Sequence, residues 1–292
     1  MYKYIPHSFL FFTIIFWGSS FPLITYSLNF LSPIELAFSR FFLPASLSFF
    51  YVCFTKTIIN REDIINFVIA GLLGIFGFAL FINLGQKTLS AGAGSFIVNC
   101  NPLITSMIGF FFLKQKLKGY FWIGILICVL GIFIISLENY DKYSFDIGTI
   151  YLLIAALFIS FYFHLVKPLV NKYGAMTTFS YTIIFGTLPM LFWCKDSYRS
   201  LIGGGFELQL SIVWLTLIAT LIPYYTWTYS VGYFGANKAS FFLFLIPLVS
   251  ILVDLIIFKN VPNIFTFIGG ILILTSVLGV LFLNYKNDLY KN

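Results

Sequence analysis

The sequence predicts an all-α membrane protein in which ten transmembrane helices form two inverted five-helix repeats around a central cavity. Hydrophobic residues make up 60% of the 292 residues and charged residues 9%, whereas a soluble domain carries roughly 25% charged residues to keep its surface solvated. Apolar runs of about 20 residues recur along the chain, the length that crosses a hydrocarbon core about 30 Å thick. Residues of the two halves also match at a fixed offset. Together these observations exclude a soluble domain.

The apolar runs are continuous rather than alternating, so they predict helices and not the strands of a membrane barrel. The first run is longer than the apolar core of a signal peptide and lacks a clear small-residue cleavage site, so we expect it to remain as a helix. The other residues are too few for an extramembrane domain. The ten expected spans are His7–Tyr26, Ile34–Thr55, Ile64–Asn83, Gly92–Phe112, Gly119–Leu137, Ile147–Val166, Thr178–Cys194, Leu210–Gly232, Ala236–Phe258 and Asn263–Asn284.

The net charge of +7 indicates membrane orientation rather than nucleic-acid binding. If the N-terminus is cytoplasmic, eleven lysines and arginines of the predicted loops and tails fall on the cytoplasmic side and five on the other. The positive-inside rule favours this arrangement. We therefore expect a multi-pass protein of the cell (inner) membrane with both termini cytoplasmic. The expected partners are the lipid bilayer and a small-molecule substrate, with no nucleic acid, and both monomer and homodimer remain open.

The four cysteines have neither metal-ligand nor redox spacing. They are typical of small buried apolar residues in membrane spans. No phosphate-binding loop ending in Gly-Lys-Ser or Gly-Lys-Thr is present either. We therefore expect no metal, no cofactor and no catalytic residue.

The two halves repeat one pattern at an offset of 145 residues. Pro44 matches Pro189, and Pro102 matches Pro247, which is difficult to obtain by chance because the chain has only 10 prolines. The sequence thus predicts a first repeat over residues 1–145 and a second over residues 146–292. Each repeat holds five spans, an odd number, so the second enters the membrane upside down. Inverted repeats of this kind are found in many secondary transporters.

The residues that repeat also resemble the EamA family of the drug/metabolite transporter superfamily. That resemblance implies a ten-helix bundle around a central cavity and transport of small metabolites. One departure is that Lys114-Gln115 and Lys259-Asn260 occupy the places where the family usually has Gly-Glu. The matching segments are Phe16-Trp17-Gly18-Ser19-Ser20-Phe21, Pro33, Ser39-Arg40-Phe41, Ala91 to Ser95, Asn101-Pro102, Tyr151 to Phe158, Gly235 to Ser240, Pro247 and Ile268-Gly269-Gly270-Ile271-Leu272.

Arg40 is a candidate substrate-binding residue because it lies inside the second expected span. A charged side chain at the centre of a bilayer is expensive, by about 2.5–3.5 kcal/mol even on insertion scales, so it usually has a purpose. Its planar guanidinium could bind a carboxylate or phosphate of a substrate. The alternative is that it binds backbone carbonyls and locks helices together. Asp254 and His164, near span ends, could be protonation sites or simply interfacial groups.

Aromatic and amide residues at equivalent depths are the other candidates for substrate binding. Positions related by the offset would meet at the interface between the repeats, where such transporters bind substrate. Aromatic walls with a few amides and hydroxyls suit a small, partly apolar metabolite, although ordinary helix packing would also explain aromatic residues in so aromatic a chain. Pro102 and Pro247 are expected to act as hinges because proline interrupts a helix. These substrate-binding candidates are Trp17, Asn83, Asn99, Tyr162, Tyr225, Tyr229 and Phe244.

The predicted function is a secondary transporter that moves an amino acid, a nucleoside or an S-adenosyl-type compound by alternating access. The alternatives are a membrane-embedded transferase and a membrane scaffold that transports nothing. The sequence leaves open whether the solute is taken up or exported, and which ion, if any, is coupled.

Overall fold

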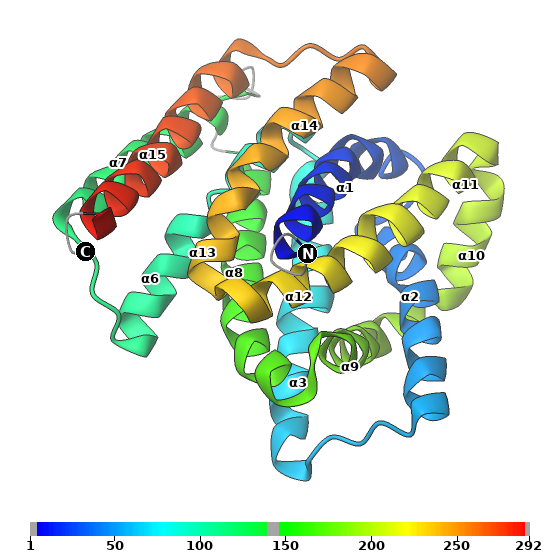
Figure 1. Ribbon diagram of the computed structural model, residues 1–292. Coiled ribbons are helices and arrows are strands. Elements are labelled where there is room, and N and C mark those ends of the chain that lie inside the picture. The colour runs from blue at the N-terminus through cyan, green and yellow to red at the C-terminus, as the bar shows by residue number, and fades with distance from the viewer. Residues whose placement is uncertain (1–4, 139–145, 290–292) are drawn as a thin grey trace.

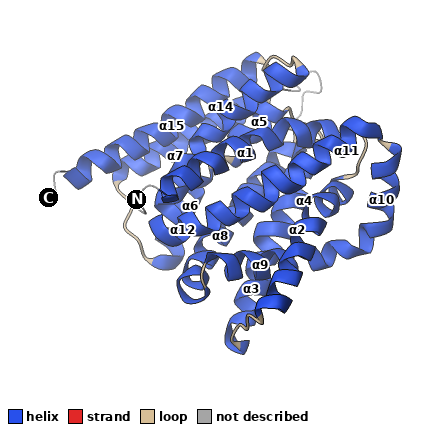
Figure 2. Cartoon of the chain, turned by 45° about the vertical axis from the view of Figure 1, so that its right-hand side comes forward, coloured by secondary structure: helices blue, strands red, loops and turns tan. Residues whose placement is uncertain are grey.

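The computed structural model describes residues 5–138 and 146–289, and these fold entirely into helices and their connections (Figures 1 and 2). The first half contains α1 Ile5–Ser27, α2 Pro33–Thr55, α3 Ile64–Gly71, α4 Phe78–Gln86, α5 Ala91–Val98, α6 Asn101–Leu113 and α7 Gly119–Ile135. The second contains α8 Ile147–Tyr173, α9 Ala175–Thr187, α10 Cys194–Gly203, α11 Gly205–Val213, α12 Ile222–Phe234, α13 Ala236–Phe241, α14 Ile246–Val253 and α15 Ile264–Leu289.

Short 3₁₀ and π segments join several of these helices into longer rods. The 3₁₀ segments are η2 Arg61–Asp63, η5 Leu188–Trp193 and η7 Phe242–Leu245, and the π segments are η3 Leu72–Gly77, η6 Trp214–Leu221 and η8 Asp254–Phe258. In the described residues, nine helical rods are long and apolar enough to cross a membrane, and the shorter apolar helix α7 makes ten. This agrees with the ten predicted spans, five in each half. The seventh and eighth rods, Ala175–Gly203 and Gly205–Phe234, are longer than predicted, because polar α10 continues the seventh and α11 begins the eighth at Gly205 rather than at Leu210.

Local sequence explains where the helices of the first and second halves begin. Ser32 caps α2 in a capping box with Glu35, and Pro33 fills the first turn, where its missing N–H does no harm. Asp146 caps α8 by accepting a hydrogen bond from the Gly148 N–H at 2.7 Å. The Glu35 carboxylate therefore belongs to the cap of α2, where it accepts a hydrogen bond from the Ser32 backbone N–H.

The fourth and ninth rods are interrupted at equivalent places. The α5 helix ends at Asn99 and α6 restarts with Pro102 in its first turn, while α13 passes through η7 before α14 restarts with Pro247 in its first turn. Prolines in those positions fit a new helix rather than breaking one. The segments therefore bend where the sequence places the prolines, and a hinge action of Pro102 and Pro247 remains a prediction.

The packing of one half repeats the packing of the other. In the first half α1 packs against α12 and α14, and in the second α8 packs against α4 and α6 (Figure 1). The offset of 145 relates α1 to α8, α4 to α12 and α6 to α14, so these contacts are equivalent pairs. The same offset relates α2 to α9 and α7 to α15, so each of these two contacts joins a helix to its own equivalent in the other half. The structure is thus a two-repeat fold, while the boundary between residues 145 and 146 adjoins residues outside the description and stays a prediction.

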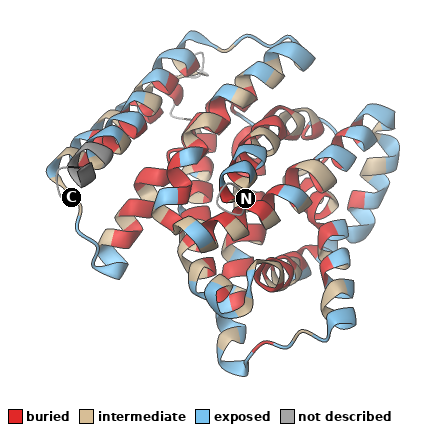
Figure 3. Ribbon diagram, in the orientation of Figure 1, coloured by how far each residue is buried: buried red, intermediate tan, exposed pale blue. Residues whose placement is uncertain are grey.

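Burial separates a central core from a periphery that faces lipid. Figure 3 shows buried residues gathered in the middle of the bundle, around α8, α12 and α13, and exposed residues along the outer faces of α7, α15, α10 and α11. The α7 and α15 helices approach closely because Gly131 and Gly269 lie backbone to backbone: a Cβ on Gly269 would be 2.4 Å from the Gly131 carbonyl oxygen. Small residues allow this kind of contact in membranes, where no hydrophobic effect drives helices together.

Candidate substrate site

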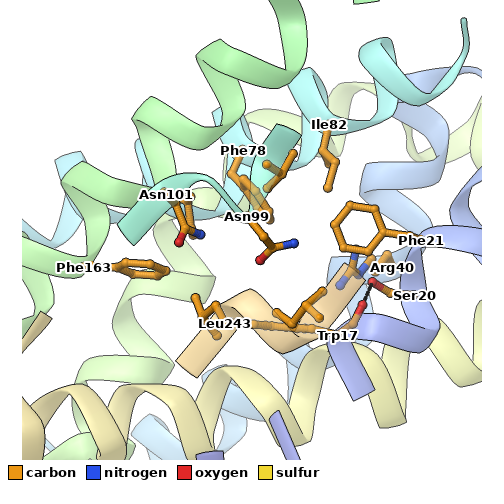
Figure 4. A pocket seen from close by; sticks show the side chains of 13 residues that line it. Trp17, Ser20, Phe21, Arg40, Phe78, Ile82, Asn99, Asn101, Phe163 and Leu243 are labelled. Atoms are coloured by element: carbon orange, nitrogen blue, oxygen red, sulfur yellow. Dashed lines mark hydrogen bonds between the residues drawn. The ribbon is translucent and has the colours of Figure 1, made fainter. Parts of the chain in front are cut away.

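A cavity lies at the centre of the bundle, between the two repeats (Figure 4). The first half supplies side chains from α1, α2, α4 and the α5–α6 break, and the second half supplies them from α8, η7 and α14. Its free volume is about 30 Å³, room for two or three water molecules rather than for a metabolite. The repeats are therefore closed around their interface. Its lining is Trp17, Ser20, Phe21, Arg40, Phe78, Ile82, Val98, Asn99, Asn101, Ile159, Phe163, Leu243 and Ile246.

Arg40 is the cationic residue of this lining and is 4% exposed. Its Nε donates to Thr220 Oγ1 at 2.5 Å, and its Nη2 donates to the Ala219 carbonyl oxygen at 2.8 Å. Both acceptors belong to the π segment η6, whose wider turn changes the direction of its carbonyls. The guanidinium also lies 5.3 Å from the centre of the Phe41 ring. Arg40 thus joins α2 to η6 while facing the cavity.

Two asparagines at the α5–α6 break provide the amides of the site. Asn99 Nδ2 donates to the Ser95 carbonyl oxygen at 2.7 Å, one turn back along its own helix. Asn101 is 2% exposed, and its buried side-chain Oδ1 accepts no hydrogen bond from any described residue. Figure 4 shows Asn99 between Asn101 and the group formed by Arg40 and Phe21. The break in the helix therefore turns two amides toward one cavity.

Three of the candidate residues predicted from sequence, Trp17, Arg40 and Asn99, line this cavity together. Trp17 packs against Tyr224 and Trp227, with ring centres 5.4 and 5.5 Å away. For Arg40 the structure shows features of both interpretations, because it binds a backbone carbonyl and also faces the cavity.

The other predicted residues lie outside the lining. Asn83 donates through Nδ2 to the Pro33 carbonyl oxygen at 2.8 Å and holds α4 to the start of α2. Tyr162 is fully buried against Gly74, and its neighbour Phe163 faces the cavity instead.

Tyr225 and Tyr229 pack around Phe9, with ring centres 6.2 and 5.2 Å away. Phe244 is half-buried, and the neighbouring Leu243 and Ile246 line the cavity. Tyr162, Tyr225, Tyr229 and Phe244 thus lie outside the lining of the central cavity. A role in substrate binding remains a prediction for each of them.

The sequence analysis did not select Ser20, Phe21, Phe78, Asn101 or Phe163 as site residues. Asn101 had the clearest signal, since it precedes Pro102 and a break is where a helical amide loses its partners. Phe163 could have been found only from the rotation of α8, which places it rather than Tyr162 toward the cavity.

Two further hollows lie toward the ends of the bundle, and they differ in charge. One, of about 510 Å³, contains Lys116, Lys118 and Lys238 and is called the lysine end; the sequence analysis assigns it to the cytoplasm. The other, of about 260 Å³, contains Glu138 and Asp254 and is called the carboxylate end. The central cavity lies between them.

Polar contacts at the two ends use groups that the sequence analysis considered for protonation. His164 Nε2 lies 2.8 Å from the Thr105 carbonyl oxygen, and Asp254 Oδ1 accepts a hydrogen bond from Asn260 Nδ2 at 3.0 Å. Outside the spans, burial raises the pKa of the Glu138 carboxyl, and the nearby polar groups of Ser90 and Thr266 oppose that rise. Glu138 is thus a titratable group whose neutral form the fold favours at this end.

A helical bundle of two repeats with a polar and aromatic cavity at their interface defines a class of multi-pass membrane transporters. The model of the EamA-like transporter family matches residues 5–137 and again residues 146–282. The chain belongs to the EamA-like transporter family, which confirms the resemblance drawn from its motifs.

Relatives support this assignment, and a solved structure shares the fold. The chain is 30% identical to the uncharacterized transporter YdfC of Bacillus subtilis, over 89% of this chain and 86% of the relative. It is 31% identical to an uncharacterized transporter of Archaeoglobus fulgidus, over 91% and 94% of the two chains. A more distant relative, 22% identical over 90% of each chain, is named a probable amino-acid metabolite efflux pump of Escherichia coli. One crystal structure shares the fold, with a TM-score of 0.67 at 16% identity over 94% of this chain and 96% of that chain.

Proposed function

We propose that this protein is a secondary transporter that moves a small organic metabolite through the central cavity by alternating access. The substrate is an amino acid, a nucleoside or an S-adenosyl-type compound, and the protein lies in the cell (inner) membrane with both termini cytoplasmic. The observation that carries the proposal is the central cavity itself. Both repeats line it, and it combines one cation and two amides with aromatic walls.

The equivalent packing of the two halves supports alternation between two states. The α1–α12 and α8–α4 contacts are related by the repeat, so rocking one half against the other exchanges two similar interfaces at little net cost. The central cavity is small, whereas the hollows at the ends are about 510 and 260 Å³. We infer that the two ends open in turn while the centre holds the solute.

Direction and substrate class have two lines of support. The Escherichia coli relative named for amino-acid metabolite efflux favours export of an amino-acid-type compound. The lysine end gives anionic solutes a favourable potential on the side assigned to the cytoplasm. Both considerations agree with loading from the cytoplasm.

Solute counterflow in proteoliposomes tests the function. Vesicles loaded with unlabelled amino acids, nucleosides or S-adenosylmethionine should accumulate the matching labelled solute only when the protein is present. We expect Trp17→Ala to lower the rate about tenfold or more, because Trp17 walls the cavity. Phe192→Ala, at a ring that is 87% exposed at the periphery, is the matched control and should keep the rate. Absence of flux for every solute class would favour a scaffold or a transferase instead.

A further inference from the structure

Arg40 carries a positive charge into the central cavity without a counter-charge. No acidic residue lines the cavity, and in the described part of the chain the one ion pair within 4.0 Å joins Lys172 to Asp63, far from this cavity. Arginine stays protonated in proteins because its guanidinium spreads the charge over three nitrogens. A cation without an anion in the centre of a membrane protein is expensive, so a function that uses the charge is expected.

One edge of the Arg40 guanidinium remains free for a ligand. Nε and Nη2 lie along one side of the group, and both donate to η6, to Thr220 and Ala219. The end edge keeps one N–H on Nη2 and the N–H groups of Nη1, which donate to no described residue. Two parallel N–H groups of this kind match the two oxygens of a carboxylate. The bonds to η6 hold this edge in place, so little side-chain entropy is lost when an anion binds.

The opposite side of the cavity offers hydrogen bonds of another kind. Asn99 Nδ2 is used within its own helix, so Asn99 contributes its Oδ1, an acceptor. Asn101 is 2% exposed and its Oδ1, a second acceptor, has no partner in the described residues, although a buried polar atom normally has one. A ligand that binds Arg40 and also places an N–H or O–H beside these amides satisfies groups that the protein leaves unpaired.

The lysine end is independent support for an anionic ligand. Lys116, Lys118 and Lys238 line its hollow of about 510 Å³, and no carboxylate lines it. The same hollow reaches Ser106 on α6, little more than one helical turn from Asn101. A positive entrance concentrates anions near the route to the cavity.

We propose that the central cavity selects organic carboxylates that also carry a hydrogen-bond donor, with Arg40 as the carboxylate-binding residue. The inference rests on the proposed transport function and narrows its substrates to compounds of the amino-acid type. The aromatic walls formed by Trp17, Phe21, Phe78 and Phe163 hold the apolar body of the ligand. A nucleoside has no carboxylate for the free edge of Arg40. A plain fatty acid has a carboxylate but no separate hydrogen-bond donor for Asn101.

Matched ligands test the selection on the intact protein in detergent. Thermal unfolding is followed with L-phenylalanine, L-leucine and L-methionine, each beside its carboxamide, and with 3-phenylpropanoate, octanoate and uridine. A ligand of the folded state raises its unfolding temperature by mass action. We expect at least one amino acid to bind about tenfold or more tightly than its carboxamide, the size expected for charge-assisted hydrogen bonds. It should also bind more tightly than 3-phenylpropanoate, octanoate or uridine.

Variants separate binding by Arg40 from its structural role. Arg40→Gln should remove the preference for the acid over the carboxamide, and Arg40→Lys should retain part of it. Thr220→Val is the control, because it removes an acceptor of Arg40 and keeps the charge; it should preserve the preference. If Arg40→Gln does not fold, the wild-type comparison of acid and carboxamide still decides.

Equal binding of acid and carboxamide, or an effect of uridine with none from any acid, would overturn the selection. Counterflow distinguishes that failure from failure of the function. A nucleoside that is transported without any acid being transported leaves the transporter standing and removes the carboxylate site. No flux of any solute removes the function itself.

Discussion

Two equivalent helix ends show what the repeat preserves and what it does not. Lys114, after α6, and Lys259, after η8, both adopt left-handed backbone, with φ of 55° and 61°. In each case the following residue returns its N–H to a carbonyl six positions earlier: Gln115 to Gly109 at 3.0 Å, and Asn260 to Asp254 at 3.3 Å. The backbone of the two ends is therefore the same although they lie at opposite ends of the bundle.

The side chains at these ends differ because position 109 is glycine and position 254 is aspartate. The Gln115 side chain folds over Gly109, where a Cβ would lie 2.5 Å from Gln115 Oε1. Gln115 Oε1 then accepts a hydrogen bond at 2.6 Å from Asn237 Nδ2 in the other half. Asn260 instead donates to the Asp254 carboxylate within its own rod. Of these two bonds, only the one at the lysine end ties the halves together.

The comparison also accounts for the departure from the family pattern at these positions. Where the family usually has glutamate, Gln115 and Asn260 are neutral amides, and both make side-chain hydrogen bonds at the helix end. An amide can donate and accept, whereas an ionised carboxylate only accepts. These positions therefore serve the helix ends and the contact between the halves through hydrogen bonds.

The largest expected effect compares Gly269 with its equivalent, Gly124. A Cβ at Gly269 would meet the Gly131 carbonyl oxygen, whereas a Cβ at Gly124 would meet the end of the Val280 side chain, which can move. Gly269→Ala should lower the free energy of unfolding by about 1–3 kcal/mol through overpacking, and Gly124→Ala by clearly less. Thermal unfolding in detergent measures both. Gly279→Ala, where nothing lies within 4 Å, is the control on the same helix and should be neutral or stabilising.

The next effect concerns the bond between the halves. Gln115→Ala should destabilise the protein by about 1 kcal/mol, because it removes the acceptor of Asn237 Nδ2 and with it a hydrogen bond between the halves. Asn260→Ala removes an exposed bond within one rod and should cost less. Gln115→Ala should also increase maleimide labelling of a cysteine introduced at Ser106, whereas Asn260→Ala should not. Equal labelling in the two variants would show that this bond does not control access at the lysine end.

A smaller effect should be the same in both repeats. Lys114→Gly and Lys259→Gly relieve the strain of a left-handed non-glycine residue. Each should raise the free energy of unfolding by about 0.5–1 kcal/mol, after allowance for the greater freedom of glycine in the unfolded chain. Thermal unfolding of the two variants side by side is the measurement. A gain at one site alone would mean that only one of the two backbones is as described.

The smallest effect depends on pH and concerns one end only. The fold raises the pKa of Glu138 above its ordinary value of 4.5 through burial, while the equivalent position in the second repeat is Leu283. Glu138 binds its proton more tightly in the folded state than in the unfolded chain. Its contribution to stability is therefore fully present below the pKa of the unfolded chain and is lost as the pH rises through the pKa of the folded state. Glu138→Gln should therefore reduce the loss of thermal stability between pH 4 and pH 7. If thermal stability depends on pH in the same way in Glu138→Gln as in the unmutated protein, the raised pKa of Glu138 is contradicted.

Composition and the spacing of residues were sufficient to predict the ten helices, the repeat and the breaks at Pro102 and Pro247. These properties depend on local chemistry: lipid excludes unpaired backbone groups, and proline removes a backbone donor from a helix. Arg40 was recognisable as a candidate site residue for the same reason, since a charge in a span is conspicuous by composition alone.

Helix rotation was decided only by tertiary packing. Apolar residues surround these helices on every side, so the sequence offers no polar face from which to read which side points inward. That is why Phe163 rather than Tyr162 lines the cavity, and Leu243 and Ile246 rather than Phe244. The π segment η6 and the break at Asn99 rotate the chain further. Arg40 and Asn101 therefore line one cavity from two different helices, an arrangement that no periodicity along one chain segment contains.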